Sequence, residues 1–155
     1  MQLVIHRVNR IKELLKIPKQ FGCEIDIRSF NGKLILNHDP YKSGDLLKDY
    51  LENYEHQLLI LNIKEAGIEE DVIKMVKSKR IKNYFLLDVE FPYLYKYSRL
   101  GQKNIAVRFS EDEPIELAIK YKDKVNWVWI DTNTQLPLNE QIIKDLKGFK
   151  SCLVC

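Results

Sequence analysis

The sequence alternates short runs of β-forming apolar residues with segments of helical spacing, and this alternation constrains the fold more than any other feature. Successive runs recur at intervals of roughly 20–25 residues for most of the chain, which is the rhythm of parallel βα units. The β runs cover residues 2–8, 23–28, 57–63, 83–89, 104–109, 126–131 and 151–155. We therefore expect an α/β fold built on parallel strands.

One segment departs from this rhythm. Asn31 and Gly32 separate the run at 23–28 from a further apolar run at 33–39, with no helical segment between the two. Asn-Gly is a favoured pair for a two-residue type I′ hairpin turn. We expect residues 33–39 to return antiparallel, as a β-hairpin excursion after the second strand.

The architecture expected from this order is an incomplete TIM (β/α) barrel that spans residues 1–155 as a single domain. Seven β runs follow one another in βα order and an eighth is missing, whereas a full barrel typically needs about 250 residues. The open edge would need a second copy of the chain or a further C-terminal segment to cover it. A doubly wound open sheet is the alternative, but no Gly-rich phosphate loop follows any run. In a third interpretation the chain is a barrel fragment that aggregates through this edge.

Composition and charge exclude several classes of protein. The 25 Lys and Arg against 22 Asp and Glu give a formal charge of +3, and the basic residues are spread along the chain, which disfavours nucleic acid as the main partner. The first apolar run is interrupted at His6 and Arg7, so it supplies no signal-peptide core and no transmembrane span of about 20 residues. Three cysteines are too few for a disulfide framework. We expect a cytoplasmic protein, with the pair Cys152 and Cys155 serving as apolar strand residues.

The second β run carries two carboxylates on one face. Glu24 and Asp26 alternate with Ile25 and Ile27, so the acidic and the apolar side chains point to opposite sides of a strand. A solvated strand face is the simpler interpretation. In a barrel, however, the apolar side faces the helices and the carboxylates face the barrel axis. Other runs also end in polar residues, namely His6, Arg7, Asn62, Lys64, Asp88, Arg108 and Asp131.

These residue types indicate a particular chemistry at the carboxyl ends of the strands, where barrel enzymes build their sites. Hard oxygen ligands without thiolates favour Mg²⁺ or Ca²⁺. His6 and His38 can act as general acid and base, because imidazole titrates near neutral pH. Cationic side chains for an anionic substrate, with phosphate as the natural candidate, are Arg7, Lys64 and Arg108. The set favours metal-assisted cleavage of a small phosphodiester.

Four motifs then carry a resemblance to a known family. The stretches "IHR", "GCEIDIR", "NGKLILNHDP" and "LILNIK", within residues 5–64, resemble in order and spacing the glycerophosphodiester phosphodiesterase family. This resemblance implies a TIM barrel related to the phosphatidylinositol-specific phospholipase C barrels, which hydrolyses glycerophosphodiesters with a divalent metal. It implies the roles of acid and base for His6 and His38, of phosphate ligands for Arg7 and Lys64, and of metal ligands for Glu24 and Asp26.

Two positions depart from the family pattern. Val8 replaces the glycine that follows His-Arg, and Asn62 stands where the family has a third metal-binding glutamate. An amide oxygen can still bind Mg²⁺ or Ca²⁺, but the site loses one negative charge and with it metal affinity. Asp88 or Asp131 could replace that charge from a neighbouring strand. The departure at Asn62 also leaves an alternative function open, in which a non-hydrolytic relative binds a phosphorylated sugar or lipid headgroup.

Overall fold

The computed structural model describes residues 2–153. The chain divides into two compact units, residues 1–89 and residues 90–155, and each is described by itself. The single domain expected over residues 1–155 stays a prediction.

A six-stranded mixed sheet forms the centre of the first unit. It contains β1 (Val4–Ile5), β2 (Gly22–Phe30), β3 (Lys33–Leu36), β4 (Asp45–Leu46), β5 (Leu59–Ile63) and β6 (Tyr84–Leu87). The strand order is β4-β3-β2-β5-β6, and β1 also pairs with β2. The pairings of β1 with β2, β2 with β5 and β5 with β6 are parallel, as the βα rhythm predicted.

Three helices accompany this sheet, namely α1 (Ile11–Leu14), α2 (Leu47–Glu52) and α3 (Glu69–Ser78). In α3 the residues Val72, Ile73 and Val76 are buried, while the intervening Lys74 is exposed. This is the apolar stripe expected of a helix that packs on a sheet. Strand β5 is buried along its whole length, so the core lies around the middle of the sheet.

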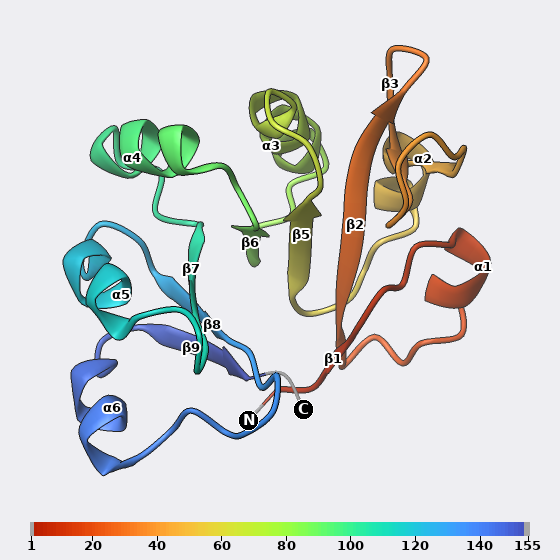
Figure 1. The fold of residues 1–155 in the computed structure, drawn as a ribbon. Coiled ribbons are helices and arrows are strands. Elements are labelled where there is room, and N and C mark those ends of the chain that lie inside the picture. Colours follow the sequence, from red (N-terminus) through yellow and green to blue (C-terminus); the bar gives the residue numbers. More distant parts are fainter. Residues whose placement is uncertain (1, 154–155) are drawn as a thin grey trace. The chain divides into compact units, whose positions relative to one another are not determined.

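The hairpin predicted after the second strand is confirmed. Phe30 pairs with Lys33 in the antiparallel β2–β3 ladder, and Asn31 and Gly32 between them have φ angles of 50° and 73°. Both values are positive, as a type I′ turn requires. The parallel ladder with β5 ends at Ile27, so the hairpin extends beyond the end of β5 (Figure 1).

The second unit contains a separate three-stranded parallel sheet. Its strands are β7 (Ala106–Phe109), β8 (Trp127–Ile130) and β9 (Lys150–Leu153), in that order, and its helices are α4 (Phe91–Arg99), α5 (Ile115–Tyr121) and α6 (Glu140–Asp145). Strand β8 is fully buried, whereas β9 is largely exposed. Cys152 lies half-buried in β9, and Cys155 lies outside the described residues.

The predicted barrel is wrong. Within residues 2–153 the strands form two separate sheets, one of mixed direction and one parallel, and they do not close on each other. The βα rhythm specifies that neighbouring strands run parallel, but closure also requires every strand to have two partners and a consistent stagger. Here β3 instead pairs antiparallel with β2, and β4 pairs antiparallel with β3. The fold is mixed α/β, and covering of its open edges by a partner stays a prediction.

Candidate active site

Two carboxylates are buried at the centre of the six-stranded sheet. Glu24 and Asp26, both on β2, are 0% exposed, and the alternation of the strand places them on one face. Asn62 on β5 is the register partner of Asp26 and is also buried. Buried charged groups need compensation by hydrogen bonds or ion pairs, so the partners of these carboxylates define the site.

Glu24 is held by groups from the segment that follows β1 and from β5. One carboxylate oxygen accepts a hydrogen bond of 2.7 Å from the backbone nitrogen of Arg7 and lies 3.5 Å from Nε2 of His6. The other accepts a bond of 2.9 Å from Nδ2 of Asn62. Burial and the nearby charge of Asp26 raise the pKa of Glu24, because both disfavour the ionised form. The hydrogen bonds oppose that shift.

Asp26 has a different set of partners. Its Oδ2 accepts a hydrogen bond of 2.7 Å from Nδ2 of Asn9, and its backbone nitrogen donates one of 2.8 Å to Oδ1 of the same asparagine. Its Oδ1 lies 3.3 Å from Nζ of Lys64, and that ammonium lies 3.5 Å from Oδ2 of Asp88. Lys64 is therefore shared between a buried and a partly exposed carboxylate.

The exposed groups of the site are two imidazoles and a guanidinium. The side chains of His6 and His38 are 51% and 44% exposed. Nε2 of His38 lies 3.3 Å from Nη2 of Arg7, and Nδ1 of His38 lies 3.1 Å from Oδ1 of Asp39. A guanidinium only donates, so these contacts assign a lone pair to Nε2 of His38 and a hydrogen to Nδ1.

Strained backbone occurs at two strand ends of this site. Arg7, after β1, has a φ of 55°, and Asp88, after β6, has a φ of 57°. Non-glycine residues in this region are uncommon and cost about 1–3 kcal/mol, and they concentrate at functional sites. Val8, which follows Arg7, is buried in the core and its nitrogen donates to the backbone oxygen of Glu24. Val8 therefore fills the core at the position where the resembled family has glycine.

The structure brings together the predicted site residues that belong to the first unit. Contacts join His6, Arg7, Glu24, Asn62 and His38, and Lys64 pairs with Asp26. Arg108 belongs to the second unit, on β7, where it pairs with Asp131 and with Glu113. Its role as a phosphate ligand stays a prediction.

Two residues of the site were missed by sequence reasoning. Asn9 binds both the side chain and the backbone of Asp26, as described above. Arg28 donates to the backbone oxygens of His38 and Lys64, at 3.1 Å and 2.9 Å, and so holds two site loops in place. Arg28 continues the alternation of Glu24 and Asp26 along β2, which places all three on one face, whereas Asn9 follows no such pattern.

The oxygen atoms of the site fit a hard divalent cation. Within residues 2–153, no group of three or more His, Cys, Asp or Glu side chains is placed to hold a metal ion. However, Oδ1 of Asp26 and Oδ1 of Asn62 are buried and accept no hydrogen bond within the described part of the chain. Carboxylate and amide oxygens are ligands that Mg²⁺ and Ca²⁺ accept. Glu24, Asp26 and Asn62 therefore supply a suitable donor set.

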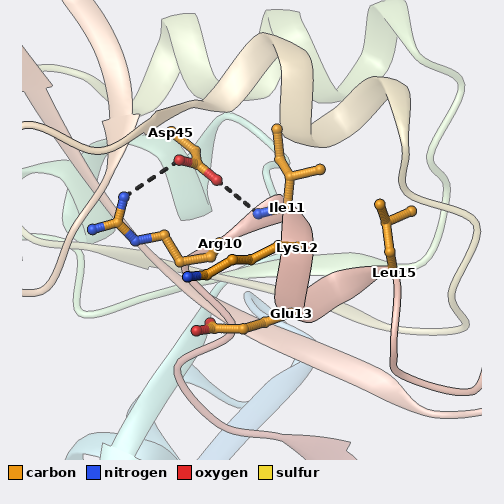
Figure 2. Close-up of a pocket in the computed structure, with 6 residues that line it drawn as sticks. All are labelled: Arg10, Ile11, Lys12, Glu13, Leu15 and Asp45. Carbon is orange, nitrogen blue, oxygen red and sulfur yellow. Dashed lines mark hydrogen bonds and ion pairs between the residues drawn. The ribbon is translucent and has the colours of Figure 1, made fainter.

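Two surface hollows of the first unit lie apart from these residues. One, of about 700 Å³, is bordered by residues 10–13, Leu15 and Asp45. Figure 2 shows the guanidinium of Arg10 and the backbone nitrogen of Ile11 both directed at the carboxylate of Asp45, at 3.4 Å and 2.7 Å. These polar groups pair with one another and fasten α1 to β4. The second hollow, of about 760 Å³, lies between the hairpin tip and α3.

Comparisons with family models, with curated proteins and with solved structures found no match for this chain. Among the residues described, none of the helices has both the length and the apolar character needed to cross a membrane.

Proposed function

We propose that the protein hydrolyses small phosphodiesters of the glycerophosphodiester type with the help of a divalent cation. The observation that carries this proposal is a chain of contacts: His6 and the backbone nitrogen of Arg7 contact buried Glu24, and the guanidinium of Arg7 contacts His38. Acid and base groups, a phosphate ligand and oxygen donors for a cation thereby occur within one network of contacts. The resemblance of residues 5–64 to the glycerophosphodiester phosphodiesterases supports the same reaction class.

The cation, Mg²⁺ or Ca²⁺, would be held by Glu24, Asp26 and Asn62. When bound, it supplies positive charge that stabilises the charge developing on the phosphoryl oxygens. The buried Oδ1 atoms of Asp26 and Asn62, which accept no hydrogen bond from the described residues, support this ligand set. The raised pKa of Glu24 supports it too, because a cation would offset the repulsion between the two buried carboxylates.

The contacts of the two histidines suggest a division of roles. Nε2 of His38 carries a lone pair and Nδ1 is oriented by Asp39, so His38 is suited to accept a proton as general base. Nε2 of His6 lies beside the carboxylate of Glu24, with which a protonated imidazole forms an ion pair. His6 is therefore suited to protonate the leaving alcohol.

Arg7 is the proposed ligand of the substrate phosphate. Its side chain is exposed and its guanidinium lies at Nε2 of His38, so a phosphate bound there would lie next to the proposed base. A guanidinium offers several donors in a planar fork that matches phosphate oxygens. Lys64 supports binding by its charge, since its ammonium is already in the site.

A second candidate function is binding of a phosphorylated sugar or lipid headgroup without hydrolysis. The observation that favours it is that both carboxylates already have protein partners, Asn62 for Glu24 and Lys64 for Asp26. Such a site can remain folded without a cation. This candidate predicts that glycerol phosphate raises the melting temperature while no phosphodiester is cleaved.

The experiment that separates the two candidates is an assay of the purified full chain with glycerophosphodiesters in the presence of Mg²⁺ or Ca²⁺. Hydrolysis that disappears with a chelator supports the first candidate. We place the activity in the cytoplasm, since Cys23 is a free thiol and reducing compartments keep thiols free.

A further inference from the structure

Lys64 lies between two carboxylates from different strands. Its Nζ is 3.3 Å from Oδ1 of Asp26 and 3.5 Å from Oδ2 of Asp88. The Lys64 side chain is 18% exposed, the Asp26 side chain 0% and the Asp88 side chain 23%. The ammonium of Lys64 therefore forms ion pairs with two carboxylates: fully buried Asp26 at the centre of the site and more exposed Asp88 at the end of β6.

The oxygen that Lys64 contacts is also one that the proposed function gives to a cation. Oδ1 of Asp26 accepts no hydrogen bond from the described residues, so its ion pair with Lys64 is the contact that would have to change. An ammonium and a divalent cation repel each other strongly in a buried environment. Binding of the cation at Asp26 therefore requires Lys64 to move away or to find other compensation.

Asp88 offers that compensation. Its carboxylate already contacts the same ammonium, so a small movement of the Lys64 side chain keeps an ion pair. The backbone of Asp88 is left-handed, with a φ of 57°, a conformation that persists only where the surrounding structure enforces it. The chain thus maintains a strained conformation at the residue that presents this second carboxylate.

We propose that Lys64 and a divalent cation compete for Asp26, and that Asp88 is a positioning residue that takes up Lys64 when the cation binds. This inference rests on the proposed function only for the existence of the cation site. Asp88 thereby acts through Lys64 and is not itself a ligand of the cation, in contrast to the sequence expectation that Asp88 could replace the missing third carboxylate.

The test is a calorimetric titration of the purified full chain with Mg²⁺ and with Ca²⁺, in wild type, Lys64→Met, Asp88→Asn and the double variant. Lys64→Met should bind the cation about tenfold more tightly, because the competitor is gone. Asp88→Asn should bind it about tenfold more weakly, because Lys64 stays on Asp26. In the Lys64→Met background, the Asp88→Asn change should alter affinity by less than about twofold, since residues that act through each other are not additive.

Lys79→Met, which breaks an ion pair to Glu52 outside the site, is the matched control and should leave the affinity for the cation unchanged.

A second measurement does not require the Lys64→Met variant, and so remains possible if that variant fails to fold. Modification of Lys64 by a lysine reagent, followed by mass spectrometry, should become faster on addition of cation in Asp88→Asn, because the displaced ammonium then lacks a partner. In wild type it should stay slow with and without cation. Equal weakening by Asp88→Asn in both backgrounds, or no cation binding in any variant, would overturn the inference. Competition without hydrolysis would contradict the proposed function alone.

Discussion

The side-chain amide of Asn62 donates a 2.9 Å hydrogen bond to a carboxylate oxygen of Glu24, and both residues are buried. The nitrogen of this amide thus faces Glu24, while its oxygen accepts no hydrogen bond within the described chain. A glutamate at position 62 would place a third carboxylate beside two that already repel each other. The amide therefore stabilises the site when no cation is present and still offers an oxygen when one is bound.

Asn62→Glu tests this relationship. We expect the variant to lose about 3 kcal/mol of unfolding free energy without divalent cations, which is the order of an uncompensated buried charge. We also expect its affinity for Mg²⁺ or Ca²⁺ to rise about tenfold or more, because the donor set gains a negative charge. Chemical denaturation with and without the cation measures both effects. Asn62→Gln, which keeps the amide, is the control, and an unchanged cation affinity in Asn62→Glu would show that position 62 does not face the cation.

Asn9→Ala probes the support of Asp26. The change removes one hydrogen bond from a buried carboxylate and one from its backbone nitrogen, and hydrogen bonds to charged groups contribute about 1.5–3 kcal/mol each. We expect a loss of about 3 kcal/mol in unfolding free energy, measured by denaturant titration. Asn53→Ala removes an exposed bond to a backbone oxygen and should cost about 0.5 kcal/mol or less. Equal losses in the two variants would contradict the structural role given to Asn9.

Glu24→Gln tests the pH dependence that burial of Glu24 implies. The pKa of Glu24 is raised from its ordinary value of 4.5 in the folded state, so the folded state holds this proton more tightly than the unfolded chain. Its contribution to stability is present below about pH 4.5 and is lost as pH rises through the folded pKa. We expect the stability of Glu24→Gln, without divalent cation, to fall less than that of wild type between about pH 5 and pH 8. A parallel pH dependence in the two proteins would contradict the shift.

Cys23 and Cys152 should differ in reactivity. Cys23 is fully buried on β2, and burial raises the pKa of its thiol to about 11, so almost no thiolate is present near pH 8. Cys152 is half-buried on β9. Because the thiolate is the reactive form, we expect alkylation of Cys152 to be at least about tenfold faster than that of Cys23, as followed by mass spectrometry of the peptides. Comparable rates would contradict the burial of Cys23.

Local features of the fold were predictable from the sequence. The Asn31-Gly32 pair specified the hairpin because few residue pairs tolerate two positive φ angles. The apolar runs located the main strands, with segments of helical spacing between most of them. The short α1 and the two-residue strand β4 were not foreseen, because their formation depends on contacts such as that of Asp45 with Ile11.

Closure of the sheet and the fine structure of the site were not predictable in this way. The βα rhythm is common to closed barrels and to open sheets, so it does not distinguish them. The grouping of Glu24, Asp26 and Asn62 followed from strand periodicity and parallel register, and is found in the structure. The contacts of Asn9, Arg28 and Asp88 depend on the paths of loops and on left-handed backbone. Neither of these features produces a periodic pattern of residues in the sequence.

The most direct test of the proposed reaction is ³¹P NMR of a glycerophosphodiester incubated with the purified chain and Mg²⁺ or Ca²⁺. We predict formation of glycerol phosphate that stops on addition of a chelator and falls at least about 100-fold in His38→Ala, the usual order of a general acid or base. His56→Ala, whose ring contacts the backbone oxygen of Ile17 outside the site, should retain wild-type turnover. An absence of turnover in wild type, or turnover that His38→Ala leaves intact, would contradict the proposed function.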